Sequence, residues 1–366
     1  MRKILLSSLV LASLLAPPGQ PLLAAAPDRL SQPALHSINA ARGLLLDLVK
    51  VPERERLLAV GEQGSILYSD DSGQSWHQAQ SPVSVLLTAV QMVTAFRGWA
   101  IGHDGVILHT EDGGESWQIQ AAGQQLLRQQ EKALEQELAI KDRLAETEAV
   151  EEIQWQLDDL QVSLEEGAMP TLMDLLFVDS QRGFVIGAYG VIFGTIDGGE
   201  SWHSLGHRLP NPDRMHLNAI LMDSRNRLLV AGEAGLLMKS DDLGGSWQSV
   251  DTPYEGSFFA LANHDQVFLL GLRGHLYRSS NGIDWQMEPV PTQASLNGAV
   301  SAKGELYLLG QGGVVLKRQG NRFVPVQPVP RYSFTSGVLL DDRLLLAGEG
   351  GIHRIDLTSV AEGAEQ

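Results

Sequence analysis

The sequence of 366 residues contains no cysteine. This absence excludes disulfide scaffolds, thiolate zinc sites, iron–sulfur clusters and cysteine nucleophiles. Basic residues are also scarce, because 27 Lys and Arg stand against 44 Asp and Glu, which gives a formal net charge of −17. So acidic a chain does not suit a protein that binds nucleic acid by neutralising phosphates. We therefore expect no nucleic-acid partner.

Long apolar runs are missing beyond the N-terminus. The chain begins with the basic residues Arg2 and Lys3, continues with an apolar run over residues 4–15 and then reaches small residues at 24–26. This is the order of a secretory signal peptide, and the run is shorter than the roughly 20 residues that cross a bilayer. We expect residues 1–26 to be a signal peptide, with an uncleaved anchor as the alternative. The predicted protein is exported to a Gram-negative periplasm and has no integral membrane segment.

Glycine is abundant, with 38 residues, and much of it follows a repeat. Seven copies of Gly-x-x-Gly each lie between two apolar runs, as in LLAVGEQGSIL at residues 57–67. The first glycines of the copies are at positions 61, 102, 187, 232, 271, 310 and 348. The spacing is close to 40 residues apart from one step of 85, between positions 102 and 187. That longer step predicts one repeat plus an insert.

A second motif, [ST]-x-D-x-G-x-S-W, follows the glycine pair in four repeats, and a shorter copy with Asn in place of Asp occupies residues 279–285. Its Ser/Thr and Asp side chains can bond loop amides, its Gly can take the left-handed conformation, and its Trp can seal the repeat. The residues predicted to have this structural role are Asp71, Gly73, Trp76, Asp112, Gly114, Trp117, Asp197, Gly199, Trp202, Asp242, Gly244 and Trp247. Because the aspartates recur once per repeat, they cannot share one pocket as catalytic acids or calcium ligands.

Each repeat has the pattern of four short strands, with the glycine pair between the second and third and the aspartate motif between the third and fourth. Seven such repeats predict an all-β fold, a seven-bladed β-propeller. The last repeat, residues 334–357, holds only about three strands, so we expect residues 36–42 to supply its outer strand and close the ring. The predicted divisions are residues 27–123, with the closing strand and blades 1–2, and residues 169–366, with blades 3–7.

Residues 124–168 form the predicted insert between blades 2 and 3. Up to residue 166 it contains neither Gly nor Pro and carries 12 acidic and 4 basic residues, a net charge of −8. A coiled-coil seam at 3-4 spacing is formed by Val150, Ile153, Leu157, Leu160 and Leu164. Because one helix would extend about 65 Å and the chain must return to the next blade, we expect an α-helical hairpin that turns near residues 143–149. The hairpin is either a solvated decoration or a docking arm, in which Trp155 anchors a partner or packs against the propeller.

The aspartate motif resembles the Asp-box of BNR-repeat proteins, and we call it the Asp-box below. Two longer segments point to a more specific family. Residues 98–117 (GWAIG…GVILHTEDGGESW) and residues 183–202 resemble the photosystem II stability and assembly factor family and its relatives in non-photosynthetic bacteria. The resemblance covers roughly residues 44–357 apart from the insert. It implies a non-catalytic assembly or accessory factor that contacts a membrane-protein complex subunit or an exported protein. The chain has no evident arginine cluster to match the basic patch associated with partner binding in that family.

The variable residues of the glycine-pair turns are expected to form a ring on one face of the propeller, on the side of the insert and opposite the Asp-boxes. The candidate binding residues of this ring are Glu62, Gln63, His103, Asp104, Tyr189, Glu233, Arg273, Gln311 and Glu349. Four are acidic and one is basic, so a cationic or hydrogen-bonding peptide is favoured over an anion. The alternative is a solvated polar rim.

The enzyme alternative is an Asp-box carbohydrate-active hydrolase, such as a sialidase-like glycosidase. Sialidase chemistry needs an arginine cluster and a tyrosine nucleophile, and the Phe-Arg-Ile-Pro motif of that family is absent. A pair of facing carboxylates stays open as a possibility. The only histidine group, His203, His207 and His216, fits a polar loop better than a metal site. We therefore predict no catalytic residue, no metal and no cofactor.

Overall fold

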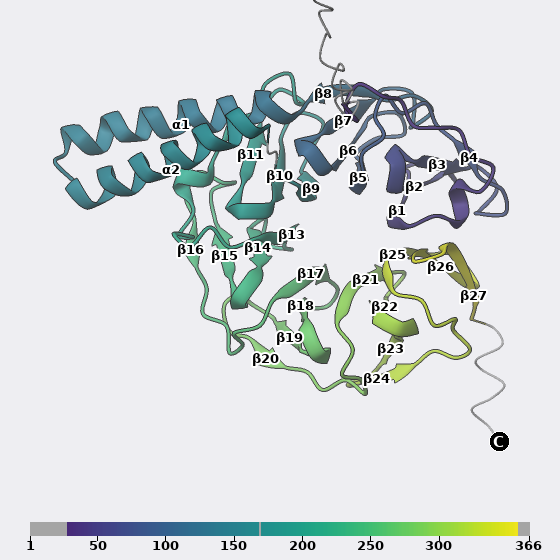
Figure 1. The fold of residues 1–366 in the computed structure, drawn as a ribbon. Helices are drawn as coiled ribbons and strands as arrows, with labels where there is room; N and C mark the ends of the chain where they lie inside the picture. The colour runs from purple at the N-terminus through teal and green to yellow at the C-terminus, as the bar shows by residue number, and fades with distance from the viewer. Residues whose placement is uncertain (1–27, 168–169, 358–366) are drawn as a thin grey trace, which may run out of the picture.

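The computed structural model describes residues 28–167 and 170–357, so the predicted signal peptide lies outside the described residues. The described strands form seven antiparallel sheets, six with four strands and one with three. The sheets stand around a central opening, in the arrangement of a β-propeller (Figure 1). Within each sheet the strands are paired in chain order, and the first strand lies next to the first strand of the neighbouring sheet.

The first four sheets along the chain share one order of elements, in which a short 3₁₀ turn separates the second strand from the third. The first sheet consists of β1 (Leu45–Lys50), β2 (Leu57–Gly61), β3 (Ile66–Ser69) and β4 (His77–Gln78), and the second of β5 (Leu87–Met92), β6 (Gly98–Gly102), β7 (Ile107–Thr110) and β8 (Gln118–Ala121). The third consists of β9 (Leu172–Phe177), β10 (Gly183–Gly187), β11 (Ile192–Thr195) and β12 (His203–Ser204), and the fourth of β13 (Leu217–Met222), β14 (Leu228–Gly232), β15 (Leu237–Ser240) and β16 (Gln248–Ser249).

The next two sheets continue this order, and the last sheet has three strands without a 3₁₀ turn between its second and third. Their strands are β17 (Phe258–Asn263), β18 (Val267–Gly271), β19 (Leu276–Ser279) and β20 (Gln286–Met287); β21 (Leu296–Ala302), β22 (Glu305–Gly310), β23 (Val315–Gln319) and β24 (Arg322–Pro325); β25 (Phe334–Leu339), β26 (Arg343–Gly348) and β27 (Gly351–Asp356). The 3₁₀ turns are η1 (Ala40–Arg42), η2 (Glu62–Gly64), η3 (His103–Gly105), η4 (Ala188–Gly190), η5 (Gly206–Arg208), η6 (Glu233–Gly235), η7 (Leu272–Gly274) and η8 (Gln311–Gly313).

The second strands form the densest part of the core. Every residue of β2, β6, β10, β14 and β18 is buried. A strand with another sheet against each of its faces needs apolar side chains on both, so its sequence is a continuous apolar run rather than an alternation. The fourth strands of these sheets have two residues, except for the four-residue β8, and they lie at the outside and are mostly exposed.

The first and last sheets meet directly. Strand β25 contacts β1, and the Thr335 hydroxyl donates a hydrogen bond to the Leu46 carbonyl at 2.7 Å. The Ser336 hydroxyl donates to Asp47 Oδ1, also at 2.7 Å. On the outside, a Cβ atom at Gly73 of the first sheet would lie 2.3 Å from the Leu345 side chain of the last. The first and last sheets are therefore joined by packing and by polar contacts.

The prediction that residues 36–42 supply the outer strand of the last sheet is wrong. The last sheet has three strands in the described structure, and residues 40–42 form the 3₁₀ turn η1, which contacts β27. This turn crosses the end of the β26–β27 hairpin so closely that a Cβ at Gly351 would lie 1.9 Å from the Ala41 carbonyl. Residues before it follow the first sheet instead, where the Ser37 amide donates to Gln78 Oε1 at 2.9 Å. A segment that meets a sheet at its end cannot pair along its edge.

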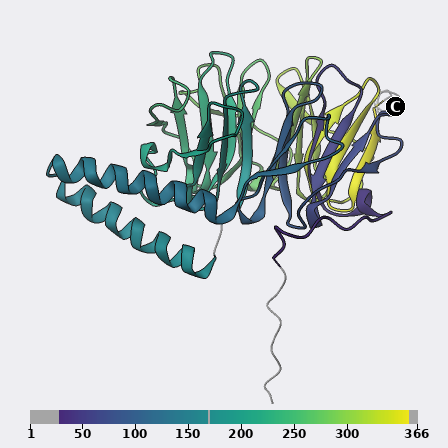
Figure 2. The ribbon, with the colours of Figure 1, turned by 90° about the horizontal axis from the view of Figure 1, so that it is seen from above.

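Two helices, α1 (Gly123–Arg143) and α2 (Thr147–Glu166), lie between β8 and β9 in the chain. They pack side by side as a hairpin that turns at residues 144–146, inside the predicted range, and projects beyond the ring from one face (Figure 2). Their apolar seam has four buried residues, Leu127, Leu134, Ile153 and Leu160. Trp155 is not part of this seam and is 61% exposed.

The Asp-box aspartates bind the turns in which they lie. Asp112 Oδ1 accepts hydrogen bonds from the Thr110 hydroxyl at 2.8 Å and the Ser116 amide at 3.0 Å, and Oδ2 accepts one from the Ser116 hydroxyl at 2.5 Å. The same three bonds form at Asp71, Asp197 and Asp242. The Ser75 hydroxyl and amide lower the pKa of Asp71 to about 2. These carboxylates are acceptors inside their own turns.

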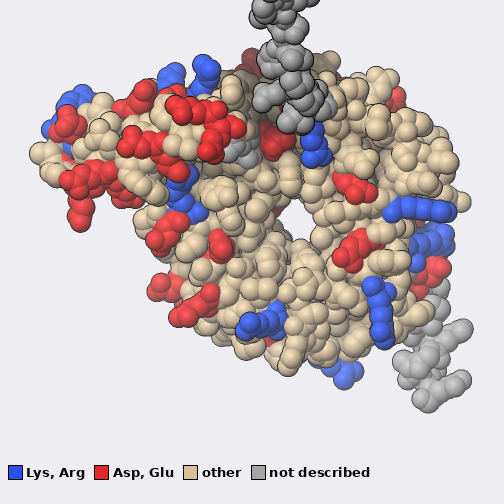
Figure 3. Space-filling model, viewed as in Figure 1, with Lys and Arg blue, Asp and Glu red and all other residues tan. Residues whose placement is uncertain are grey.

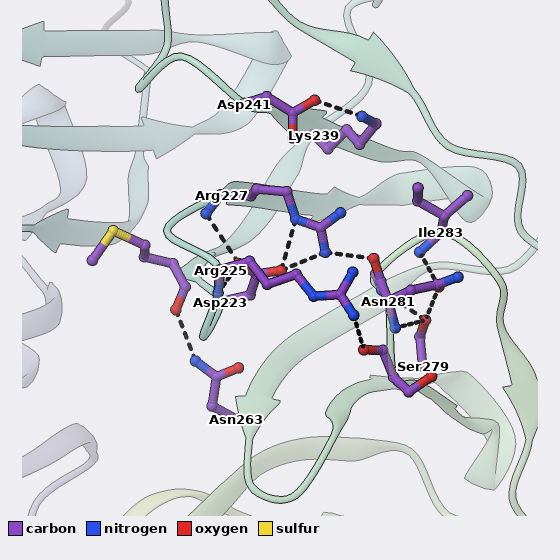
Figure 4. Close-up of polar contacts among 12 residues, drawn as sticks. Asp223, Arg225, Arg227, Lys239, Asp241, Asn263, Ser279, Asn281 and Ile283 are labelled. Carbon is purple, nitrogen blue, oxygen red and sulfur yellow. Dashed lines mark hydrogen bonds and ion pairs between the residues drawn. The ribbon is translucent and has the colours of Figure 1, made fainter.

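The Asp-box turns also join neighbouring sheets. Arg227, just before β14, binds Asp223 Oδ2 through Nε at 2.9 Å, and its Nη2 donates to the Asn281 carbonyl in the Asn-containing turn of the next sheet (Figure 4). Arg56 is in the equivalent position before β2 and donates to the Gly113 carbonyl of the next sheet at 3.1 Å. Each of these arginines is largely buried. They link one sheet to the turn of the next.

Replacing Asp112 with Ala tests the role of the Asp-box. We expect the free energy of unfolding to fall by about 1–2 kcal/mol, because the turn loses the acceptor of several hydrogen bonds, as at a helix cap. Urea unfolding measures this. The matched control is Glu111→Ala, which removes an exposed ion pair with Arg97 and is expected to change stability by less than about 0.5 kcal/mol. Equal losses in the two variants would contradict the structural role.

Candidate functional site

The strand order places two kinds of loop on one face of the ring. Turns between second and third strands lie there with the connections between sheets, whereas the Asp-box turns lie at the opposite ends of the strands. The amide of Gly64, for example, donates to the carbonyl of Val85 in the connection to the next sheet, at 2.7 Å. The hairpin is itself such a connection, and α1 contacts the η3 turn. We call this side the turn face.

The turns have a shared backbone geometry. Their middle residue takes a left-handed conformation even where it has a side chain, as at Gln63 (φ 56°) and Tyr189 (φ 56°). The second glycine follows with a positive φ, for example 70° at Gly190. The first glycine is extended but closely packed, since a Cβ at Gly61 would lie 2.1 Å from the Leu44 carbonyl. The Gly-x-x-Gly pattern therefore reflects two separate constraints.

Three glutamates of the predicted ring bind the backbone. Glu62 Oε1 accepts a hydrogen bond from the Leu44 amide at 3.0 Å, just before β1. Glu349 makes the equivalent bond with the Ser333 amide at 2.9 Å, and Glu233 with the amide before β13 at 3.3 Å. In each case the glutamate amide donates back to the carbonyl of the same partner residue. These carboxylates hold the turn against the start of the first strand, a role that the sequence alone did not indicate.

The other ring residues differ in exposure. Gln63, Tyr189, Arg273 and Gln311 are exposed, whereas His103 and Asp104 are half-buried in the turn that α1 contacts. The structure places all nine residues in the turns of one face but does not gather them into a single pocket. Only Tyr189 of the nine lies in a groove shared with the hairpin.

This groove lies between α2 and the sheet that begins with β9. It has a volume of about 570 Å³. Its apolar lining comes from Leu127, Trp155, Leu160, Pro170, Tyr189 and Val191. Both aromatic side chains are 61% exposed. The sequence pointed to Trp155 and Tyr189 separately, but their juxtaposition depends on how the hairpin folds back over the turn face.

Polar contacts hold the two walls of the groove together. Arg214, in the connection from β12 to β13, forms an ion pair with Asp159 of α2 at 2.6 Å. The Tyr189 amide donates to His216 Nδ1 at 2.8 Å, and the two rings meet edge to face at 5.1 Å. The groove is therefore formed from segments that are far apart in the sequence, among them both helices, the η4 turn and the connection from β12 to β13.

The central channel contains two carboxylates, Asp47 on β1 and Asp174 on β9. Asp174 Oδ2 accepts a hydrogen bond from the Ile220 amide of the next sheet at 2.8 Å, and Asp47 Oδ2 accepts one from the Val90 amide at 2.9 Å. Burial, with a smaller contribution from the Asp47 carboxylate, raises the pKa of Asp174 to about 7. Both carboxylates therefore tie neighbouring first strands together.

The three histidines considered for a metal site have separate surroundings. His203 lies on β12, His207 lies in η5, and His216 binds the Tyr189 amide. Among the residues that the structure describes, no group of three or more His, Asp or Glu side chains could hold a metal ion. In the same part of the chain, no helix has the length and apolar character needed to cross a membrane.

Comparison with known families decides the relationship. The model of a family described as photosynthesis system II assembly factor YCF48 matches residues 37–130 and 147–255, which is more than half of the chain. The chain belongs to this family. The gap in the match, residues 131–146, corresponds to the later part of α1 and the turn that follows it, whereas all of α2 is matched.

Two curated relatives support the assignment to the YCF48 family. "Photosystem II assembly lipoprotein Ycf48" of Synechococcus sp. (strain CC9902) is 28% identical over 173 residues, which cover 46% of this chain and 49% of the relative. "Photosystem II stability/assembly factor HCF136, chloroplastic" of Oryza sativa subsp. japonica is 25% identical over 167 residues, which cover 42% of this chain and 40% of the relative. The matched part thus spans half or less of the length of these relatives.

Solved structures of the YCF48 family have the same fold. YCF48 from Cyanidioschyzon merolae matches with a TM-score of 0.61 and 12% identity, over 87% of this chain and 97% of that one. A structure described as YCF48 bound to D1 peptide matches with a TM-score of 0.61 and 15% identity, over 89% and 99% of the two chains. At the level of the fold, the β-propeller prediction is confirmed.

The raised pKa of Asp174 predicts a pH dependence. The pKa in the folded state, about 7, lies above the ordinary value of 3.8, so this group stabilises the fold fully below pH 4 and loses that contribution as pH rises through 7. We expect the stability of the parent protein, measured relative to Asp174→Asn by urea unfolding, to fall between about pH 4 and pH 7 and to stay level above that range. The control, Asp241→Asn at an exposed site, should give a parallel curve. A constant difference between parent and Asp174→Asn would contradict the prediction.

Proposed function

We propose that this protein is an exported, non-catalytic assembly factor that binds an extended segment of a subunit of a membrane-protein complex. Membership of the YCF48 family supports an assembly role, and one solved relative is described as bound to a D1 peptide. The observation that carries the proposal for this chain is the groove on the turn face, which offers two exposed aromatic side chains beside a rigid ring. Exposed aromatic side chains are common anchors at protein interfaces.

The proposed architecture is a closed seven-bladed propeller in which each sheet is one blade. The hairpin is then an insert between blades 2 and 3, and the proposed location is the periplasm of a Gram-negative bacterium. The contacts of β25 with β1 support closure, and the position of α1 and α2 between β8 and β9 supports the insert. A closed ring holds its loops in fixed positions, which suits a binding platform.

Among the nine candidate residues of the turn face, we assign partner contact to the exposed ones, above all Tyr189. Glu62, Glu233 and Glu349 are better described as structural, because each has an oxygen bonded to a backbone amide of its own sheet. Loss of these glutamates would disturb the turns before it disturbed any contact with a partner.

The geometry does not favour the hydrolase alternative. A glycosidase needs two carboxyl groups placed on either side of the scissile bond. Asp47 and Asp174 are the two carboxylates of the channel lining, and each accepts hydrogen bonds from backbone amides of two adjoining sheets. Their oxygens hold the ring together rather than stand free for a substrate.

Deletion of the gene tests the proposed function. We expect at least one membrane-protein complex to decrease on native gels of the membrane fraction while its subunits are still synthesised, because an assembly factor acts after synthesis. Re-expression of the full chain should restore the complex. If every complex keeps its parental level in the deletion strain, the assembly role is wrong.

A truncated hairpin is the informative variant in the same strain. Gln161 on α2 donates a hydrogen bond to Glu131 on α1, so a short Gly-Ser turn can replace residues 132–160 without separating the remaining ends. The truncation keeps Leu126, which belongs to the propeller core. We expect it to fold but not to restore the complex. Full restoration would make the hairpin a decoration.

A further inference from the structure

The surface along α2 has a length and shape that suit an extended peptide. Two adjoining cavities, of about 570 and 280 Å³, both include Tyr189 and Arg214 in their lining. Together they touch α2 from Ala149 to Ser163, a helical stretch of about 21 Å. A peptide that rises about 3.3 Å per residue would need about six residues to follow it. We call this continuous surface the α2 groove.

The charge of the hairpin is concentrated on the helix that lines the groove. Helix α2 carries seven carboxylates and no Lys or Arg, whereas α1 carries four acidic and four basic residues. Only Asp159 of the seven has an ion pair in the described structure, with Arg214. Figure 3 shows the acidic side chains gathered over the hairpin. The groove therefore lies in a field that attracts cations.

Trp155 stands in the middle of these charges. Glu151 and Glu152 precede it by one helical turn, and Asp158 and Asp159 follow it by one turn. All four carboxylates are exposed. An indole face with carboxylates on both sides can pack against an apolar side chain while its neighbours pair with Lys or Arg. Such an arrangement recognises a mixed sequence, not charge alone.

Tyr189 forms the opposite wall in a strained conformation. A bulky residue with φ 56° and ψ 32° is uncommon, and Gly would adopt this conformation at lower cost. The Tyr189 side chain is nevertheless 61% exposed, so its burial does not offset the cost of this conformation. The same left-handed conformation occurs at the middle of the other turns, at Gln63, Asp104, Ala234 and Arg273, so it is a property of the turn. Here it directs an aromatic side chain into the groove beside α2.

We propose that the α2 groove binds an extended, cationic segment of the partner subunit, in which Lys or Arg alternate with apolar residues. This inference rests on the proposed function and names the partner segment of that same face. An apolar side chain packs between Trp155 and Tyr189, and the cations pair with the α2 carboxylates. A second copy of this chain does not suit the groove, because each copy has a net charge of −17. An anionic lipid surface is repelled for the same reason.

The test is fluorescence anisotropy with the full chain and a labelled, capped peptide of about twelve residues in which Lys alternates with Leu. We expect Trp155→Ser and Tyr189→Gly each to weaken binding about tenfold. The matched control is Ile196→Ser, which removes a 71% exposed apolar side chain of the same sheet on the Asp-box side and should leave binding unchanged. The thermal midpoint of Tyr189→Gly should not fall, since the substitution relieves strain.

A pair of charge reversals separates a located site from general attraction. Glu152→Lys changes the groove lining, and Glu135→Lys makes the same change of net charge at an exposed position of α1 outside both cavities. We expect the first to weaken binding several-fold more than the second, and we expect no binding of a peptide with Glu in place of Lys. Equal effects of Glu152→Lys and Glu135→Lys would overturn the proposal. So would equal binding by Trp155→Ser and Ile196→Ser, or equal binding of the acidic peptide or of anionic vesicles.

Failure of the α2 groove proposal can be told apart from failure of the proposed function. If the full chain restores the membrane complex but the peptide does not discriminate among these variants, the assembly role stands and the α2 groove is wrong. If the complex is also unaffected by deletion of the gene, the proposed function fails as well.

Discussion

The structure depends on burial of both faces of every sheet against its neighbours in a ring. A small four-stranded sheet cannot bury enough apolar surface alone, so the second strands, apolar on both faces, are stable only between two other sheets. Close approach follows from this requirement. Extended glycines such as Gly61 and Gly102 let the second strand pass the carbonyl that precedes the first strand, where a Cβ would collide. The turns, the Asp-boxes and the channel contacts all hold neighbouring sheets in this arrangement.

Because the chain has no cysteine, polar side chains rather than disulfides link its turns and sheets. The Asp-box aspartates accept hydrogen bonds from their own turns, and Arg56 and Arg227 donate to the turns of the next sheets. Asp47 and Asp174 join neighbouring first strands at the channel wall. Most acidic groups of the ring are thus used internally. The acidic groups of α2 are less used in this way, because only Asp159 of the seven forms an ion pair with another described residue, Arg214, and they lie beside an exposed tryptophan. Most carboxylates of the propeller thus have partners within the protein, whereas most of those on α2 have no ion pair in the described structure, and this contrast suggests where a partner binds.

Much of this arrangement could be predicted from the sequence, because repeats encode local contacts. The apolar runs and turn motifs gave strand order and turn positions, and the 3-4 seam indicated two helices with a turn that falls at residues 144–146. Contacts between distant segments could not be predicted. Residues 36–42 were expected to form an outer strand, but the path of η1 across Gly351 depends on how the ring closes. Arg before the second strand recurs in four repeats, at Arg56, Arg97, Arg182 and Arg227, and this was an overlooked signal. The pairing of Trp155 with Tyr189 had no sequence signal.

The central claim is that a membrane-protein segment occupies the groove between α2 and the ring in living cells. The most direct measurement is photo-crosslinking from a reactive amino acid placed at position 155, with the same amino acid at position 196 as the control, followed by mass spectrometry of the joined peptides. The account predicts that position 155 joins one segment of a membrane-protein subunit, rich in Lys or Arg with apolar residues between them, and that position 196 does not. The same products from both positions, or an acidic segment at position 155, would contradict it.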